Sequence, residues 1–524
     1  MSRAKMIPEH INSLADYIEE TFSTFSDRPA YSALGQTKTF AEMDVLSAKF
    51  AAWLQSHTSL KPGDRIAVQL PNLIQHPIAV YGALRAGLVI VNTNPLYTER
   101  EMEHQFKDSG AKALVILSDL LPKFENIKAH TDIQHVIVTS APQLLTNTPV
   151  GHDEYPCYSQ IFKQAEGLSM QARPAAHLDD TCILQYTGGT TGVSKGAELT
   201  HQNVLANSLQ TLSRLGKALK PGEEVVVCPL PLYHIYAFTV CMMTFFAKGA
   251  MVLLIPNPRD IDGFVTTLKG QSFTAFAGIN TLFMGLCAHP DFKNIDFTPL
   301  RLTMSGGTAL TRFAADLWQE TTACSVTEGY GLSETSPVVA FNIPGHETIG
   351  TVGPALEETE IALLDQNDDI VPAGEAGQIA VRGPQVMKGY WKRDDKNNEV
   401  MTKDGFFKTG DVGEFTSDNC LKIVDRLKDM IIVSGFNVYP NEVEDILTLH
   451  DDVLEAAVVG KSDSKTQERV CAFITVNGQY DQKSLLAHCR KHLTAYKVPK
   501  EIHVLEELPK SSVGKILRRE LRDK

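Results

Sequence analysis

The amino-acid sequence predicts an α/β protein in three parts: a large N-terminal domain of layered βαβ units, a small β-rich subdomain and a small, mobile α+β C-terminal domain. Three observations support this prediction. Up to about residue 350, short apolar runs alternate with helical stretches of roughly ten to fifteen residues, which is typical of parallel strands joined by helices. After that point, short strands and turn signals follow one another. Beyond the charged segment 425–429, the chain has its own pattern of strands and helices, so we expect two domains, 1–425 and 426–524.

The N-terminal domain is predicted from two series of strands and helices. The first series comprises helix 40–56, strand 64–70, helix 77–86, strand 88–91, helix 98–107 and strand 113–116. The second series has strands at 225–227, 251–255, around 275 and at 302–304. Residues 235–247 form an apolar run of about thirteen residues, shorter than the roughly 20 that a bilayer requires, and they predict a buried helix.

The later parts are predicted from shorter elements. The β-rich subdomain is expected to have strands at 360–364, 377–382 and 413–415. The C-terminal domain is expected to have strands at 430–433, 455–459 and 470–476, with helices at 441–449 and 482–493.

The composition limits the classes of function. A chain of 524 residues exceeds the roughly 250–300 that one core usually holds. Its net charge of −13 argues against nucleic acid as a partner. The nine cysteines form no CxxC pair, which favours a reducing cytosol over a disulfide framework or a zinc site. The N-terminus has no apolar segment of the kind that secretory signals carry, so we expect a cytoplasmic protein.

A glycine-rich loop at 186–196 is the strongest candidate site. It holds four glycines, four Ser/Thr hydroxyls and Lys195, and such loops can close their backbone N–H groups around phosphate oxygens. Its spacing differs from the Walker pattern, because Val193 and Ser194 separate Gly192 from Lys195. The alternative is a plain surface turn. The apolar run 182–184 before the loop and the helix expected from about Thr200 favour the anion-binding interpretation.

Two further stretches could contact a nucleotide. The small residues at 305–308 directly follow a predicted strand, where open α/β sheets bind ligands. In the stretch 328–335, Tyr330 could stack on a base and Glu334 could bind Mg²⁺, although a tight turn with a solvated glutamate is the alternative.

Three charged positions could complete such a site. Asp411 ends a predicted strand and could accept hydrogen bonds from ribose, or simply lie in a Gly-Asp turn. Arg426 offers a second ribose contact or a surface ion pair. Lys515 follows a Ser/Gly loop that could deliver a positive charge to a developing anion. The arginines after it, at 518, 519 and 522, are expected to form a solvated face. Since no Ser/His/Asp set, HExxH or GxSxG occurs, we expect positioning and charge neutralisation rather than a covalent enzyme intermediate.

Taken together and in order, these stretches resemble the adenylate-forming superfamily of acyl-CoA synthetases, adenylation domains and luciferases. The matching motifs are YTGGTTGVSKG, YGLSET, KTGD, DRLKD with GFNVYPNEVE, and PKSSVGK. The segments 71–72, 94–97, 231–236 and 255–260 are similar to bacterial long-chain fatty acid–CoA ligases and extend the likeness over nearly the whole chain. One departure is Gly188, where many relatives carry Ser or Thr.

The resemblance implies a two-step reaction in one site. A fatty acid carboxylate attacks the α-phosphorus of ATP to form an acyl-adenylate and pyrophosphate, and the thiol of coenzyme A then displaces AMP. The resemblance assigns catalytic roles to Lys515, Glu334, Thr187 and His234. The nucleotide-binding residues that it implies are Thr187, Gly188, Gly189, Thr190, Thr191, Lys195, Gly306, Gly307, Thr308, Gly329, Tyr330, Gly331, Ser333, Asp411, Arg426 and Lys515. Thr190 and Glu334 would hold Mg²⁺.

The resemblance also implies that the small domain turns during the cycle. Lys428 would be the hinge, and the turn would withdraw Lys515 and bring Gly435 and Phe436 to coenzyme A. Phe238, Ala277 and Gly278 would line the acyl pocket, with the small residues leaving room for a chain.

The remaining alternatives concern the substrate and the acceptor. A medium-chain or aryl acid, or a carrier-protein thiol, would use the same parts, and a nucleotide sensor without turnover is disfavoured because Glu334 and Lys515 are both present. The sequence leaves two further possibilities open. The protein could contact the inner face of the cytoplasmic membrane as a peripheral protein, and it could form a homodimer.

Overall fold

Two large sheets form most of the N-terminal domain. The computed structural model describes residues 3–143, 154–173, 175–187, 194–463, 465–478, 480–511, 514–522 and 524. In these ranges the first sheet has the order β17 (Gly389–Tyr390), β8 (Lys195–Thr200), β7 (Thr181–Thr187), β4 (Val89–Asn92), β3 (Arg65–Gln69), β5 (Ala111–Leu117), β6 (His135–Thr139). The strands from β7 to β6 pair in parallel, which confirms the βαβ prediction for this region.

The second sheet is also largely parallel. Its order is β14 (Val338–Phe341), β13 (Val326–Gly331), β12 (Leu302–Ser305), β11 (Ala275–Gly278), β9 (Val225–Cys228), β10 (Met251–Leu254), β1 (Pro29–Ala33), β2 (Gln36–Thr39). The strands from β13 to β1 pair in parallel, whereas β2 and β14 pair antiparallel at the two edges.

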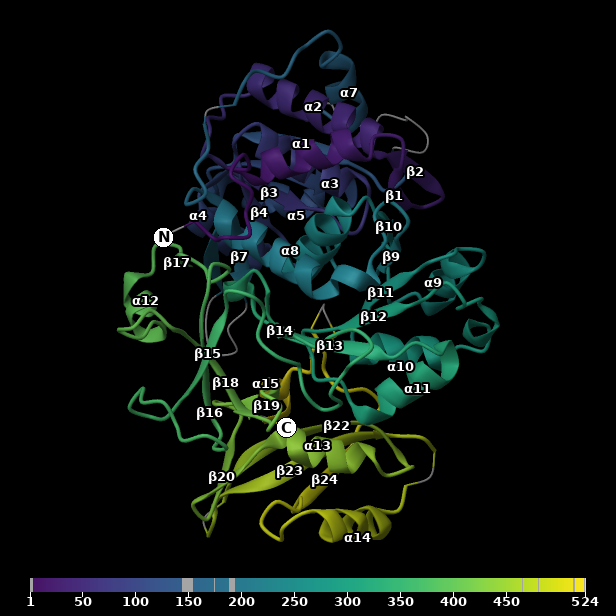
Figure 1. Cartoon of the computed structure of the whole chain (residues 1–524), viewed down its shortest axis with the longest axis vertical. Helices are drawn as coiled ribbons and strands as arrows, with labels where there is room; N and C mark the ends of the chain where they lie inside the picture. Colours follow the sequence, from purple (N-terminus) through teal and green to yellow (C-terminus); the bar gives the residue numbers. More distant parts are fainter. Residues whose placement is uncertain are drawn as a thin grey trace.

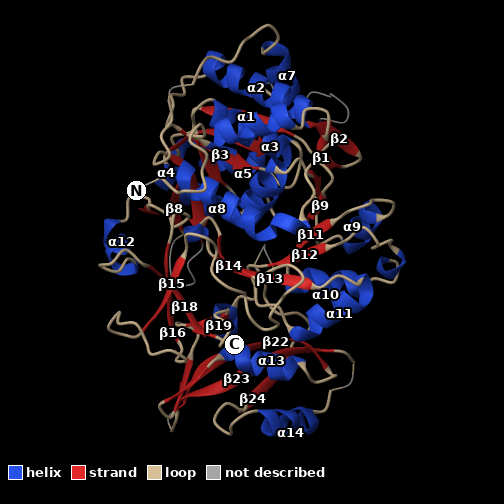
Figure 2. Cartoon of the chain, viewed as in Figure 1, coloured by secondary structure: helices blue, strands red, loops and turns tan. Residues whose placement is uncertain are grey.

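Helices cover these sheets, as Figures 1 and 2 show. They include α1 (Leu14–Thr24), α2 (Phe40–His57), α3 (Gln75–Arg85), α4 (Glu99–Ser109), α5 (Leu121–Ile127), α7 (Tyr158–Gln164), α8 (His201–Leu215), α9 (Ile261–Leu268), α10 (Asn280–Ala288), α11 (Arg312–Thr322) and α12 (Asp394–Val400). Local signals explain where several begin. Thr39 and Glu42 form a capping box at the start of α2, and Thr98 and Glu101 form one at the start of α4. The helix α4 ends at Ser109, and its C-cap residue, Gly110, has a left-handed φ of 62°.

Two smaller sheets complete the fold. The β-rich subdomain is an antiparallel sheet of β15 (Glu360–Leu364), β16 (Gly377–Arg382), β18 (Phe407–Phe415) and β19 (Leu421–Arg426). The last sheet contains β21 (Phe436–Val438), β20 (Ile431–Val433), β23 (Gln467–Val476), β22 (Val453–Asp463) and β24 (Glu501–Val504). With α13 (Pro440–Thr448) and α14 (Gln482–His492), it forms the lowest part of the molecule in Figure 1, and α15 (Arg518–Arg522) lies just above it and contacts β22.

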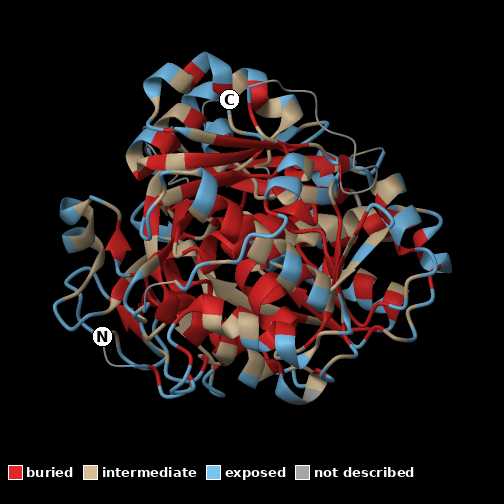
Figure 3. Ribbon diagram, turned by 90° about the horizontal axis from the view of Figure 1, so that it is seen from above, coloured by how far each residue is buried: buried red, intermediate tan, exposed pale blue. Residues whose placement is uncertain are grey.

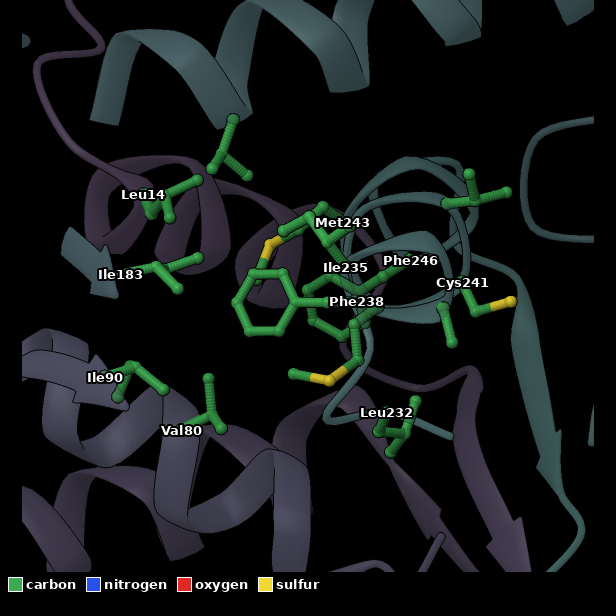
Figure 4. Packing of buried hydrophobic residues seen from close by; sticks show 14 of the residues in the cluster. Leu14, Val80, Ile90, Ile183, Leu232, Ile235, Phe238, Cys241, Met243 and Phe246 are labelled. Atoms are coloured by element: carbon green, nitrogen blue, oxygen red, sulfur yellow. The ribbon is translucent and has the colours of Figure 1, made fainter. Parts of the chain in front are cut away.

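The main core lies between the two large sheets. The apolar run that predicted a buried helix forms a π-helix at Ala237–Phe245, and every residue of it is buried. It packs against α8, and Figure 4 shows Phe238 among side chains that come from α1, α3, β4 and β7. Buried residues fill these layers, while exposed residues gather at the periphery (Figure 3). Within the ranges given above, no helix has the length and apolar character needed to cross a bilayer.

One prediction about local structure is wrong, and two strands were not predicted. The helix expected from about Thr200 is confirmed, because α8 begins at His201 with Thr200 as its N-cap, but β8 lies between the glycine-rich loop and this helix and pairs antiparallel with β7. The stretch 328–335, for which a tight turn was the alternative interpretation, begins within β13, which is held between β12 and β14. Asp411 does not end a strand, since β18 continues through it to Phe415.

Candidate active site

Most of the predicted site residues converge where the two large sheets meet the β-rich subdomain. Thr187 ends β7 and is the cross-strand partner of Lys195, the first residue of β8. Residues 188–193 of the glycine-rich loop, among them the predicted phosphate contacts Gly188, Gly189, Thr190 and Thr191, lie outside the described residues. The structure therefore describes only the two ends of this loop.

One side of the site is a hydrogen-bonded group around Asp411. The hydroxyl of Tyr330 donates to Asp411 Oδ2 at 2.6 Å, and Arg426 Nε lies 3.4 Å from Asp411 Oδ1. Asp411 and Arg426 are directly opposite each other in the pairing of β18 with β19. Burial, together with the charge of Asp411, raises the pKa of Tyr330, so this tyrosine stays a neutral donor. The arrangement presents a largely buried carboxylate beside an aromatic ring.

The turn after β12 lies next to this group. A Cβ atom added to Gly306 would meet the backbone oxygen of Gly329 and the ring of Tyr236, each at 3.4 Å. The hydroxyl oxygens of Tyr236, Ser305 and Thr308 are buried and have no hydrogen-bond partner in the described part of the chain. Since buried polar atoms are nearly always satisfied, these hydroxyls are available to a ligand. Gly307 has a φ of 84°, which suits glycine in this turn.

Glu334 and Lys195 lie on the other side of the site. Glu334 belongs to the 3₁₀ turn Ser333–Thr335 and is buried, and its Oε1 accepts a hydrogen bond of 2.7 Å from the hydroxyl of Tyr390. The ammonium of Lys195 lies 4.1 Å from the centroid of the Tyr390 ring. No lysine, arginine or histidine in the ranges that the structure describes forms an ion pair with Glu334. A buried carboxylate without a cationic partner suits Mg²⁺, which prefers oxygen ligands.

Lys515 closes the site from the C-terminal side. Its ammonium lies in largely desolvated surroundings, which lower the pKa of Lys515 to about 7; Arg426 lowers it further, whereas Asp411 raises it. Burial also lowers the pKa of His234 to about 4, with a further contribution from Lys515. Lys515 therefore interacts electrostatically both with the Asp411 group and with His234.

The loop that carries Lys515 packs against the N-terminal domain. A Cβ atom added to Gly514 would lie 2.6 Å from Ile279 Cδ1 and 2.9 Å from Thr281 Oγ1, and Gly514 has a φ of 75°. Only a glycine allows this close approach with that backbone conformation. The position of Lys515 therefore depends on tight contact between segments more than two hundred residues apart.

The prediction of a solvated face after Lys515 is wrong for Arg518. Its side chain is only 16% exposed and forms two hydrogen bonds with Glu444, at 2.7 and 3.0 Å. Asp429 lies 3.6 Å from Arg518 and 2.7 Å from Arg522. These ion pairs join α15 to α13 and to the segment after β19. Lys428 lies in that segment, and burial lowers the pKa of Lys428, with a further contribution from Arg426.

The residues predicted for coenzyme A lie elsewhere. Gly435 and Phe436 belong to the hairpin of β20 and β21, which Figure 1 places in the last sheet, apart from β12 and β13. Phe436 is 57% exposed and stacks on Tyr496, with ring centroids 4.9 Å apart. The structure does not bring these two residues to the Asp411 group.

The residues predicted for the acyl pocket are packed in this conformation. Phe238 is fully buried in the main core, and Ala277 and Gly278 lie in β11. The room expected beside Gly278 is absent there, because a Cβ atom added to it would lie 2.6 Å from the ring of Phe283. The ring of Phe276 closes the same space at 3.0 Å.

Sequence reasoning missed Tyr390. Among the described residues it is the contact shared by Lys195 and Glu334, which are predicted to hold phosphate and metal. The only local signal is its place in an aromatic pair, Tyr390 and Trp391, after a glycine. That signal does not distinguish a site residue from an ordinary core aromatic.

Comparisons with known proteins agree with this geometry. Two family descriptions match the chain: "AMP-binding enzyme" over residues 18–391 and "AMP-binding enzyme C-terminal domain" over residues 442–515. A long-chain-fatty-acid–CoA ligase of Salmonella typhimurium is 44% identical over 99% of this chain and 96% of its own length. The crystal structure of ATP-bound MatB from Rhodopseudomonas palustris is similar, with a TM-score of 0.86 and 27% identity over 98% of this chain and 99% of that one.

A third comparison concerns the fold alone. The anthranilate CoA ligase AuaEII, in complex with anthranoyl-AMP, has a TM-score of 0.90 and 24% identity, and the match covers 100% of this chain and 98% of that chain. The first family description matches more than half of the chain. The chain therefore belongs to the AMP-binding enzyme family.

Proposed function

We propose that this protein activates a long-chain fatty acid with ATP and transfers the acyl group to coenzyme A. The observation that carries the proposal is the position of Lys515, whose loop packs against Ile279 and Thr281 and whose ammonium interacts with Asp411, Arg426 and His234. A relative that is 44% identical over nearly its full length is a long-chain-fatty-acid–CoA ligase, which supports the choice of acid.

The first step joins the fatty acid carboxylate to the α-phosphorus of ATP. A carboxylate oxygen forms a bond to this phosphorus while the bond to the oxygen that bridges to the β-phosphorus breaks, and pyrophosphate leaves. In the proposed mechanism the ammonium of Lys515 lies between the two anions and reduces their repulsion. Asp411 and Arg426 hold the ribose, and Tyr330 lies against adenine. The turn at Gly306 and Gly307 flanks the base from the other side.

The proposed phosphate contacts are Thr187, Lys195 and Ser333. Glu334 is proposed to hold Mg²⁺ together with Thr190, and Mg²⁺, when bound, offsets the charge of the phosphate oxygens. Because the carboxylate of Glu334 is buried and has one oxygen already hydrogen-bonded, its second oxygen is the candidate ligand.

The second step transfers the acyl group. The sulfur of coenzyme A bonds to the acyl carbon, the bond from that carbon to the AMP oxygen breaks, and AMP leaves. We propose that the chain turns about Lys428 between the steps, which removes Lys515 and brings Gly435 and Phe436 to the pantetheine arm. Phe238, Ala277 and Gly278 are proposed to line the acyl path, where the rings beside Gly278 would have to move.

Fatty acids of increasing chain length test the proposed substrate. ATP- and coenzyme A-dependent thioester formation should reach its highest kcat/KM with long chains. Benzoate, hydroxycinnamates and medium-chain acids serve as competing substrates in the same assay. Preference for an aryl or medium-chain acid would reject the long-chain assignment, and ATP binding without pyrophosphate exchange for any acid would reject the ligase.

Replacing Gly514 by valine tests the proposed closure. We expect adenylation, measured as pyrophosphate exchange into ATP, to fall about 10- to 100-fold, because the new side chain meets Ile279 and Thr281 and displaces Lys515. Thioester formation from supplied acyl-adenylate should stay near wild type. Gly478→Val is the matched control, since Gly478 also has a positive φ, 87°, but no atom of the described residues lies within 4 Å of an added Cβ. Equal loss of both half-reactions would contradict the closure.

We further propose that the protein works in the cytoplasm and meets its substrate at the inner face of the cytoplasmic membrane as a peripheral protein. The support is chemical, since long-chain fatty acids partition into bilayers.

A further inference from the structure

A short segment of the chain joins the two sides of the candidate site. This segment, residues 387–391, contains β17 and pairs with β8 through Tyr390 and Ala197. At its start, the backbone N–H of Met387 donates to the backbone oxygen of Glu334 at 2.8 Å. At its end, the backbone N–H of Trp391 donates to the oxygen of Gly196, also at 2.8 Å. The segment is therefore fixed both to the turn that carries Glu334 and to the strand that follows the glycine-rich loop.

Tyr390 is the side chain of this segment that contacts both the carboxylate of Glu334 and the ammonium of Lys195. Its hydroxyl donates to Glu334 Oε1 at 2.7 Å, and its ring lies 4.1 Å from the ammonium of Lys195. The residue is only 6% exposed, and Asn397 holds its backbone by accepting from the Tyr390 N–H at 2.6 Å.

The ring of Tyr390 contacts the positive charge of Lys195, and its hydroxyl contacts the negative charge of Glu334. Lys195 and Glu334 carry opposite charges and both touch Tyr390, but among the described residues they form no ion pair with each other. An ion pair between them would occupy the carboxylate that Mg²⁺ needs and the ammonium that phosphate needs. A cation over an aromatic ring, by contrast, keeps its full positive charge and its hydrogen-bond donors.

We propose that Tyr390 is a positioning residue that keeps Lys195 and Glu334 from pairing with each other. Lys195 is then available to bind the phosphates of MgATP, and Glu334 is available to bind its metal ion. This inference rests on the proposed function. The hydroxyl fixes one oxygen of Glu334 and leaves the other for the metal, while the ring seats the ammonium of Lys195 toward the phosphates. Tyr390 itself touches neither reacting atom in this proposal, and its effect passes through the two charged groups.

Two substitutions separate the two contacts. Tyr390→Phe keeps the ring under Lys195 and removes only the hydroxyl that holds Glu334. Tyr390→Leu removes both contacts and allows Lys195 and Glu334 to pair. The matched control is Tyr158→Phe, because Tyr158 is also buried and its hydroxyl donates to the backbone oxygen of Gln75 at 2.9 Å, outside the candidate site.

Binding measurements without turnover provide the test. The full-length protein is titrated with Mn²⁺ in the presence of α,β-methylene-ATP, whose α–β linkage cannot be cleaved, and bound Mn²⁺ is followed by electron paramagnetic resonance. Binding of the same nucleotide is measured separately in EDTA. For Tyr390→Phe we expect Mn²⁺ affinity to fall about 10-fold, as is typical when a group that orients a metal ligand is lost. Nucleotide affinity in EDTA should stay within about twofold, since the ring contact with Lys195 remains.

For Tyr390→Leu we expect both affinities to fall, and Tyr158→Phe should change neither. Two results for Tyr390→Phe would overturn the inference and leave the proposed function standing. One is an Mn²⁺ affinity equal to that of the wild-type protein. The other is an equal loss of affinity for Mn²⁺ and for the nucleotide in EDTA. Failure of the wild-type protein to bind Mn²⁺ with the nucleotide would overturn both. If Tyr390→Leu does not fold, the conservative Tyr390→Phe variant decides the outcome alone.

Discussion

Replacing Lys515 by alanine should lower pyrophosphate exchange into ATP by about 10³-fold and leave thioester formation from supplied acyl-adenylate nearly unchanged. The reason is that the ammonium is enclosed beside Asp411 and Arg426, where it can offset charge between a carboxylate and the α-phosphate. In the second half-reaction the proposed domain turn removes this group. The two half-reactions are measured separately, the second as a single turnover.

Lys510→Ala is the matched control for this prediction. Lys510 belongs to the same terminal segment, but its ammonium pairs with Glu455 at 2.8 Å, away from the Asp411 group. We expect this variant to retain both half-reactions. If Lys515→Ala slowed both half-reactions equally, the role assigned to Lys515 would be refuted.

The same assignment has a pH signature. The pKa of Lys515 is lowered to about 7, so in the free enzyme the ammonium loses its proton well below the pH at which an ordinary lysine does. Since the charged form is the active one, kcat/KM for adenylation should fall about tenfold per pH unit above this value. Lys515→Arg should lose this decline, because a guanidinium stays protonated. If kcat/KM of the Lys515→Arg variant declined with pH as in the wild-type protein, the decline would belong to a group other than Lys515.

Replacing Glu334 by glutamine should have the second-largest effect. The substitution keeps the shape and one acceptor oxygen but removes the charge proposed to hold Mg²⁺, and we expect pyrophosphate exchange to fall about 10²- to 10³-fold. The loss should be partly recovered at high Mg²⁺ concentration, so the measurement is the exchange rate as a function of Mg²⁺.

Glu198→Gln provides the control for the loss of charge. Glu198 lies on β8 of the same sheet and pairs with Lys388 at 3.1 Å, and no metal is proposed for it. Its Mg²⁺ dependence should match that of the wild-type protein. A Glu334→Gln variant with the wild-type Mg²⁺ dependence would remove Glu334 from the proposed metal site.

The periodic elements could be predicted because their signals are local. The helix α2 was expected at 40–56 and is found at Phe40–His57, where Thr39 and Glu42 form its capping box. The strand β3 was expected at 64–70 and is found at Arg65–Gln69, with four of its five residues buried. In both cases the side chains that determine the element lie within a few residues of one another, and their spacing reports which face is buried.

The missed elements depend on partners elsewhere in the chain. The residues of β8, KGAELT, have a weak strand preference, and the strand exists because it pairs with β7 and β17. In the same way β13 contains two glycines and is held between β12 and β14. The burial of Arg518 depends on Glu444, which lies 74 positions away.

By itself the sequence determined the α/β class, the order of the main strands and helices, and the chemical groups available for a phosphate, a metal and a ribose. The resemblance of its motifs indicated which reaction these groups would serve. Only the tertiary structure decided which groups are neighbours: Tyr330 with Asp411, Lys515 with the Asp411 group and His234, and Tyr390 between Lys195 and Glu334. The physical reason is that hydrophobic periodicity reports contacts within one element, whereas these neighbours are set by the packing of several sheets over separations of up to several hundred residues.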